Sequence, residues 1–229
     1  MPNYVRNIIQ MKGIASLPLF TENAGGEKDF DFNKLIPMPE SLNVECGSRT
    51  EECILYYLTD RLALSMEDLD EEKAGLVKTL IRNMFNPDWP QSLFERLQKR
   101  VPDMSQQEQD EMYQHGIQYV ENYRKYGAVT WYEWCNREWG TKWNAGDTEI
   151  IGEDTVIFET AWDNPEPVIL KLAEMYPQAK IEHWWADEDV GSNTGYHCIE
   201  GDTIVTQTPE NGSDEALGFY SLCWGYVPE

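Results

Sequence analysis

A change of periodicity divides this chain of 229 residues and limits its possible folds more than any other feature. From about residue 50 to residue 124, apolar side chains recur every three or four positions, which is typical of helices with one buried face. The flanking segments alternate like strands or break at Gly and Pro. We therefore predict a single elaborated domain, in which a helical insertion at about 50–125 interrupts a sheet core at 1–49 and 126–229.

The helical stretch carries its own start and stop signals. Pro87 and Pro90 separate two apolar stripes, and the spacing of Ser105 and Glu108 is that of a capping box, which predicts a helix start at that point. The first stripe comprises Leu76, Val77, Leu80, Ile81, Met84 and Phe85, and the second comprises Leu93, Phe94, Leu97 and Val101. We expect these helices to form a small bundle.

The remainder of the chain predicts a sheet. Expected strands lie at 4–13, 149–151, 155–161, 180–186, 196–199 and 203–207, with an extended segment at 30–36. A short helix should follow Thr130, another should begin at Asn164 and Pro165, and a last one should be capped by Ser213. The order of these elements predicts an α+β fold, namely a ferredoxin-like antiparallel sheet with helices on one face.

Charge is the most informative part of the composition. The chain has 18 basic and 41 acidic residues, a formal net charge of −23. Such a field repels nucleic-acid phosphates and anionic membrane surfaces, and it accelerates encounter with a basic protein. We therefore expect a basic protein partner and no direct binding to nucleic acid or membranes, while solubility alone remains the alternative explanation of the charge.

The sequence also indicates a cellular setting. It contains no run of about 20 apolar residues, and its N-terminus lacks the apolar stretch of a secretory signal. Its five cysteines have no CxxC spacing, which argues against a disulfide framework and a zinc ribbon. We therefore expect a cytoplasmic protein with reduced cysteines.

Several motifs resemble one known family. They are Asn7 with the preceding Pro2-Asn3 pair, and the blocks 32–39, 131–135, 139–145, 160–167 and 186–196. Together they resemble the YubB ferredoxin-like family of proteins carried on bacterial plasmids, phages and integrated elements. The resemblance covers both ends of the chain but little of the stretch from 50 to 125. It implies a mobile genetic element as the source and defines no catalytic residues; the scattered cysteines also give no iron–sulfur spacing.

The densest polar cluster is an acidic turn with Asp187, Glu188, Asp189 and Asn193. Oxygen ligands of this kind suit a hard cation, but the spacing departs from that of a calcium loop. The other interpretation is a hairpin turn or partner-contact loop, in which Gly191 and Gly195 adopt positive φ. We favour this second interpretation and predict no metal ligands.

An aromatic groove is a second candidate site. Its predicted walls are Trp139, Trp143, Trp162 and Trp185 with the amide of Asn144. Lys142 could lie over a tryptophan ring or pair with the acidic turn. The alternative, which we favour, is that the tryptophans pack helices against the sheet.

Catalysis has weaker support in the sequence. The three histidines are His115, His183 and His197, of which the last two fall on adjacent predicted strands. Cys198 follows His197 directly, so the two side chains should point to opposite faces of the sheet. No phosphate-binding glycine motif is present. We therefore predict no catalytic residue and no cofactor.

Two functional hypotheses follow from these features. The first is an acidic protein-interaction module of a mobile genetic element, which inhibits a host nucleic-acid-binding or defence protein in its most concrete form. The alternative is a small-molecule or metal-dependent enzyme that uses the aromatic groove and the carboxylates at 187–189. A purely structural role is not separable from the first hypothesis by sequence, and no oligomeric state is predicted.

Overall fold

The structure is a computed structural model that describes residues 3–82 and 85–226. The chain divides into two compact units. The sheet unit comprises residues up to 38 and from 135 onward, and the helical unit comprises 39–134. Pro2 of the N-terminal motif and Met84 of the first helical stripe lie outside the described residues.

The sheet unit is built on six strands, each antiparallel to its neighbours. They are β1 (Tyr4–Gln10), β4 (Gly146–Ile151), β5 (Thr155–Ala161), β6 (Lys180–Asp187), β7 (Gly195–Glu200) and β8 (Thr203–Gln207), in the spatial order β4-β5-β1-β6-β7-β8. Helix α5 (Trp131–Glu138) precedes β4, and α6 (Glu166–Met175) connects β5 to β6. This connectivity is that of a ferredoxin-like fold extended by β7 and β8, so the predicted α+β class is confirmed.

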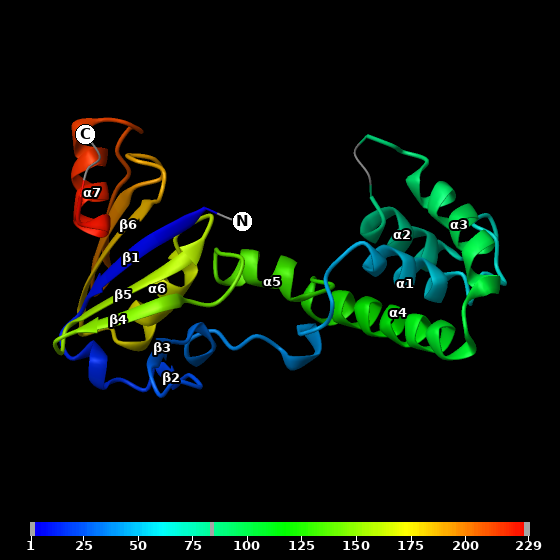
Figure 1. The fold of residues 1–229 in the computed structure, drawn as a ribbon, viewed down its shortest axis with the longest axis horizontal. Coiled ribbons are helices and arrows are strands. Elements are labelled where there is room, and N and C mark those ends of the chain that lie inside the picture. Colours follow the sequence, from blue (N-terminus) through cyan, green and yellow to red (C-terminus); the bar gives the residue numbers. More distant parts are fainter. Residues whose placement is uncertain (1–2, 83–84, 227–229) are drawn as a thin grey trace. The chain divides into compact units, whose positions relative to one another are not determined.

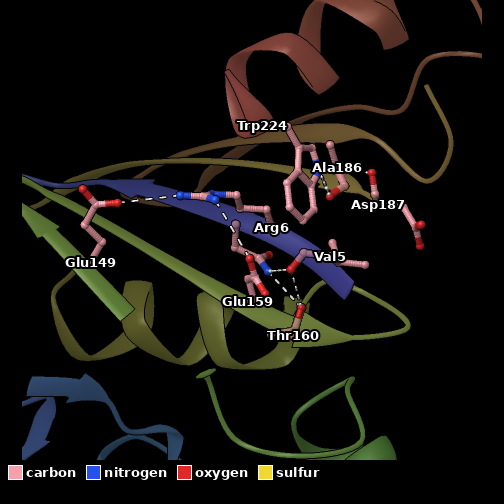
Figure 2. Close-up of polar contacts among 9 residues, drawn as sticks. Val5, Arg6, Glu149, Glu159, Thr160, Ala186, Asp187 and Trp224 are labelled. Carbon is pink, nitrogen blue, oxygen red and sulfur yellow. Dashed lines mark hydrogen bonds and ion pairs between the residues drawn. The ribbon is translucent and has the colours of Figure 1, made fainter. Parts of the chain in front are cut away.

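The main core lies on one face of the sheet. Because side chains alternate along a strand, Val5, Asn7 and Ile9 of β1 are buried on this face, while Arg6 and Ile8 point to the other. Helix α6 buries Val168, Ile169 and Leu172 completely. Figure 2 shows α6 and the C-terminal helix on opposite sides of the sheet.

The C-terminal helix α7 (Asp214–Trp224) packs on the second face. Its residues Tyr220, Cys223 and Trp224 contact Ile8, Trp184 and Ala186. The guanidinium of Arg6 lies on this face between Glu149 and Glu159, at 3.7 and 4.0 Å, and 5.6 Å from the Trp224 ring centroid (Figure 2). The sequence predicted helices on one face of the sheet only. The structure has α7 on the opposite face as well, because apolar side chains of β1 and β6 also point there.

The connection from β1 toward the helical unit differs from the extended segment predicted at 30–36. Strands β2 (Phe20–Glu22) and β3 (Lys28–Phe30) form a separate hairpin. A short 3₁₀ turn then runs through Phe32–Lys34, because the Asp31 carboxylate accepts the backbone amide of Asn33 at 3.0 Å and caps it. Phe30 and Phe32 are nevertheless fully buried.

The main helices described in the helical unit, labelled in Figure 1, are α1 (Arg49–Leu58), α2 (Glu71–Leu80), α3 (Trp89–Arg100) and α4 (Gln106–Tyr126). They share one apolar core. Helix α4 begins at the predicted capping box of Ser105 and Glu108, which is confirmed. It crosses α1 at Gly116, where a Cβ atom would lie 2.2 Å from the Cys53 carbonyl oxygen. Within the described ranges, no helix combines the length and apolar character needed to cross a bilayer.

The borders of the helical unit fall outside those predicted at about 50 and 125. The segment before α1 belongs to this unit because the side-chain amides of Gln118 and Asn122 both donate to the Ser41 carbonyl at 2.8 Å. Helix α2 ends at Leu80, and the predicted stripe is wrong at Phe85, which is 95% exposed. Whether both units behave as one domain stays a prediction.

Candidate functional site

Three loops meet at one end of the sheet. Strands β5 and β6 both end there, because each is antiparallel to β1, which lies between them. Strand β7 begins there and β8 ends there, because β7 is antiparallel to both β6 and β8. The loops are 162–165, 188–194 and 208–213. We call these loops, with the first turns of α6 and α7, the acidic end.

The acidic end carries many carboxylates. Within 162–166, 188–194 and 208–215 the sequence has no Lys or Arg. Its exposed acidic residues are Asp163, Glu166, Glu188, Asp189, Glu210, Asp214 and Glu215. The charge is also unequal between the units, since the sheet unit has 23 acidic and 8 basic residues and the helical unit 18 and 10. The acidic end therefore presents a concentrated negative surface.

Hydrogen bonds hold the three loops together. The backbone amide of Gly212 donates to the Gly191 carbonyl at 2.9 Å, and the Asn193 side-chain amide donates to the Trp162 carbonyl at 3.2 Å. Trp162 and Asn193 adopt φ of 74° and 41°, values that are uncommon for residues other than glycine. Trp162 is also 53% exposed. Such strain is often concentrated at functional sites, which makes this corner a candidate contact surface.

The predicted acidic turn has a clear structural role. The side-chain amide of Asn3 donates to Asp187 at 3.1 Å and to Asp189 at 3.0 Å, and the Tyr4 amide donates to Glu188 at 3.2 Å. Burial raises the pKa of Asp187, although hydrogen bonds from the Asp189 amide and from Asn3 act against that rise. The turn thus fixes the N-terminal strand, while Glu188 and Asp189 remain exposed.

The structure gives no additional support to a metal site at this turn. Over the described residues, no group of three or more His, Cys, Asp or Glu side chains is arranged to hold a metal ion. The Asp187 carboxylate oxygen that faces the turn already accepts Asn3 and the Asp189 amide.

A polar pocket of about 290 Å³ opens at the acidic end. All three loops contribute to its wall, together with β6, β7 and β8. Its lining residues are Asn164, Glu166, Trp185, Asn193, Thr194, His197, Thr206, Thr208, Pro209 and Asn211. The pocket therefore brings together Trp185 and Asn193, two of the residues predicted from the sequence.

A stack of three rings lies beside this pocket. His183 and His197 are cross-strand neighbours on β6 and β7, with ring centroids 5.7 Å apart. The Trp185 ring lies 5.2 Å from His183 and 4.6 Å from His197. Trp185 can occupy this position because its strand partner is Gly195, where a Cβ atom would lie 2.2 Å from the indole. The predicted positive φ is confirmed at Gly191 but is wrong at Gly195, where close approach is the reason for glycine.

The hydrogen bonds of Asn7 assign a tautomer to His183. The Asn7 side-chain amide donates to the Val5 carbonyl and the Thr160 hydroxyl, both at 2.9 Å. Its Oδ1 therefore accepts from His183 Nε2, at 3.0 Å, so the proton lies on Nε2 when the imidazole is neutral. Burial, with a contribution from His197, lowers the pKa of His183 well below its ordinary value of 6.5.

Three pocket residues carry a buried polar atom that has no hydrogen-bond partner within the described ranges. These atoms are Asn164 Oδ1, Thr194 Oγ1 and His197 Nε2. Thr194 and His197 are each only 4% exposed. The other nitrogen of His197, Nδ1, contacts the Thr206 hydroxyl at 3.0 Å. Burial lowers the pKa of His197, against an opposing effect of the Glu166 carboxylate.

Such atoms need an explanation, because most buried polar groups in proteins are hydrogen-bonded. Three of them in the wall of one pocket indicate a place that a polar ligand or ordered water completes.

The other predicted groove residues lie elsewhere in the sheet unit. Trp139 is 3% exposed, and its indole N–H donates to the Ile36 carbonyl at 2.9 Å. Asn144 accepts the Phe32 amide at 2.8 Å and donates to Asp31 at 2.8 Å. Both residues thus hold the segment that follows β3.

Lys142 and Trp143, two further residues of the predicted groove, lie close together. The ammonium of Lys142 lies 4.8 Å from the Trp143 ring centroid, which matches the predicted placement over a ring. Neither residue lines the pocket at the acidic end. The single aromatic groove proposed from the sequence is therefore distributed over at least two places in the sheet unit.

The histidine expectations can also be compared with the structure. His183 and His197 are paired across β6 and β7, whereas Cys198 is paired with Glu182 in the neighbouring register position and so lies on the other face. His115 lies on α4 in the helical unit. The sequence reasoning missed Asn164 and Thr194 as pocket residues, because nothing in a single loop shows which other loops it meets.

Comparison with known proteins supports the fold. Residues 138–222 match a family model described as the ferredoxin-like domain in Api92-like protein, a range that includes β4 to β8 and the acidic end. The chain is thus similar to Api92-like proteins over this part, and the comparison does not give the YubB name.

One solved structure was also found. A crystal structure of the protein api92 from Yersinia pseudotuberculosis aligns with 93% of this chain and 100% of its own, at 10% sequence identity and a TM-score of 0.38. No curated protein matches the sequence.

Proposed function

We propose that this chain is a binding protein whose acidic end docks onto a basic protein partner. The supporting observation is that seven exposed carboxylates gather at the acidic end, whose sequence over 162–166, 188–194 and 208–215 has no Lys or Arg. Opposite charges on two surfaces raise the association rate and fix the orientation of the encounter. The strained, half-exposed Trp162 would supply an apolar contact beside these charges.

A concrete form of this proposal is inhibition of a host nucleic-acid-binding or defence protein, with carboxylates taking the place of phosphates. The resemblance to the YubB family, whose members are carried on mobile genetic elements, favours such a setting. In this form the protein and nucleic acid compete for one basic surface. Addition of the protein should then release DNA from that surface in a salt-dependent manner.

Localised charge removal tests the proposal. A variant of the acidic end would carry Glu188→Gln, Glu210→Gln and Glu215→Gln. The matched control would carry Glu67→Gln, Glu95→Gln and Glu121→Gln, which remove the same charge from exposed positions of the helical unit. Binding of a fluorescent oligoarginine peptide is measured at low salt.

The two variants should behave differently if the acidic end is the docking surface. The acidic-end variant should bind about tenfold more weakly than the unmodified chain, since three exposed ion pairs contribute about 0.5 kcal/mol each. The control should change binding about twofold at most, because the three charges that it removes do not belong to the acidic end. Equal losses in both variants would show that only net charge matters and would refute the proposal.

The second hypothesis, an enzyme acting on a small molecule, keeps one point of support. The pocket places His197 near the Glu166 carboxylate, a pairing used in general acid–base chemistry. Its metal-dependent form lacks a suggested ligand set among the residues described. Calorimetric titration with divalent ions tests that form directly, and heat of binding would revive it.

A further inference from the structure

The polar pocket at the acidic end has the chemistry of a site for a cationic group. We propose that it binds the guanidinium of an arginine side chain, with the ammonium of lysine as a weaker substitute. This inference deepens the proposed function and rests on it for the source of the cation, namely the basic partner. Its own support comes from the pocket wall.

The charges of the wall favour a cation. None of the ten lining residues is Lys or Arg, and Glu166 contributes a carboxylate. Four more exposed carboxylates lie in two loops that contribute to the wall or at the start of α7, at Glu188, Asp189, Glu210 and Asp214. A phosphate or carboxylate ligand would meet these charges without compensation, which is costly in a partly enclosed site. An anionic ligand is therefore disfavoured.

Three oxygen-bearing groups of the wall favour a ligand that donates hydrogen bonds. Asn164 Oδ1 can only accept, the Glu166 carboxylate can only accept, and Thr194 Oγ1 has lone pairs free to accept. A guanidinium offers five N–H donors in a planar fork and no acceptor, so it can satisfy several separate acceptors at once. An ammonium offers three donors from one point, which reaches fewer of them.

The size of the pocket is also suitable. A volume of about 290 Å³ holds about ten water molecules at roughly 30 Å³ each, which is enough for an arginine side chain together with ordered water. The Trp185 ring in the wall is held between Gly195 and the fully buried His183, on which it stacks, so this wall does not need to form on binding. A preformed site reduces the entropy lost on binding.

The test uses small probes on the full-length protein. N-acetyl-arginine methylamide is titrated at constant ionic strength, and its neutral shape-match N-acetyl-citrulline methylamide serves as the control ligand. Methyl and imidazole signals of Thr194 and His197 report on the pocket by NMR spectroscopy. We expect the arginine probe to bind in the millimolar range and at least about tenfold more tightly than the citrulline probe.

Two variants connect the binding to named groups. Thr194→Val removes one hydroxyl at nearly constant shape and should weaken binding of the arginine probe about fivefold. Glu166→Gln removes an exposed charge and should weaken it about threefold, with a smaller dependence on salt. Thr203→Val, on an exposed position of β8 outside the pocket, should leave binding unchanged. Because Glu166 is exposed, its variant keeps the test valid even if Thr194→Val fails to fold.

The source of the cation is distinguished by a further pair of probes. Free arginine binding more tightly than the blocked probe would indicate a free amino acid as the ligand. If the blocked probe and free arginine bind equally tightly, and N-acetyl-lysine methylamide binds more weakly than both, the ligand is an arginine side chain of a protein, as proposed.

The outcomes separate this inference from the proposed function. If arginine and citrulline probes bind equally, or if no pocket signal shifts, the pocket holds only water and the inference is wrong. Oligoarginine that still binds through the acidic end would then leave the proposed function intact. If instead the arginine probe binds in the pocket while acidic-end variants do not affect oligoarginine, the docking proposal fails and the pocket site stands.

Discussion

Acid should destabilise the sheet unit through His183. This imidazole is fully buried, and burial lowers its pKa well below 6.5, so it stays neutral in the folded protein. In the unfolded chain the same group binds a proton below about pH 6.5. The unfolded state therefore binds more protons as the pH falls, and stability present above pH 6.5 is lost below it.

The size of the effect follows from this difference. At pH 5.5, one unit below the unfolded pKa, a histidine that remains neutral when folded loses about 1.4 kcal/mol of unfolding free energy relative to pH 7.5. His197 adds to this loss because its folded pKa is also lowered. Asp187 acts in the opposite direction, since its folded pKa is raised. A comparison between variants is therefore needed to isolate His183.

The variant His183→Gln removes the titrating group and keeps an N–H that can donate to Asn7 Oδ1. Hydrogen exchange of the β6 amides, followed by mass spectrometry, gives the opening free energy of the sheet unit separately from that of the helical unit. At pH 7.5 the variant should be less stable because its packing against Trp185 is poorer. Its loss between pH 7.5 and 5.5 should be smaller than that of the unmodified protein by about 1.4 kcal/mol.

Two results would refute this reasoning. One is an identical loss of stability on acidification in both proteins, which would mean that His183 does not titrate differently on unfolding. The other is an NMR signal showing His183 protonated in the folded protein at pH 5.5.

Three substitutions and one control, Gly75→Ala, probe close packing and a buried charge, each followed by thermal and urea denaturation. Gly195→Ala should destabilise the sheet unit by about 1–3 kcal/mol and alter the pocket, since its Cβ would meet the Trp185 ring; unchanged stability would mean that the ring moves freely. Gly116→Ala should lower the free energy of unfolding of the helical unit by at least about 3 kcal/mol, because its Cβ would meet the backbone of α1. The control Gly75→Ala, with open space around it, should leave stability unchanged or raise it. Glu52→Gln should lower the free energy of unfolding by about 1–2 kcal/mol, since this carboxylate is 4% exposed and accepts three hydrogen bonds from the half-exposed Arg96 and Arg100. A loss of stability that disappears at high salt would instead mean that the carboxylate acts as a screened surface charge.

Much of the fold could be predicted because periodicity is a local property. The strand at β5 was expected at 155–161 and occupies those residues, and Ser213 caps α7 as its spacing indicated. Local signals were misleading where another part of the chain decided the outcome. Phe85 continues a helical stripe in sequence, yet α2 ends at Leu80 and leaves it exposed.

The candidate site could be predicted only in part. The sequence singled out Trp185, Asn193 and the acidic turn, which do meet at the acidic end. It could not show that Asn164 and Thr194 face the same pocket, because they lie on different loops about 30 residues apart. It also joined Trp139 to this group, although the indole of that residue is committed to the Ile36 carbonyl.

The sequence by itself determined the class of elements, their order and the charge of −23, since these depend on each residue and its near neighbours. The tertiary structure decided which strands pair, and so which loops share one end of the sheet. Pairing brings residues far apart in sequence into contact through backbone hydrogen bonds that any side chain can make. The pocket beside His197 and the acidic loops that contribute to its wall therefore come together only once β5, β6, β7 and β8 have been placed in order.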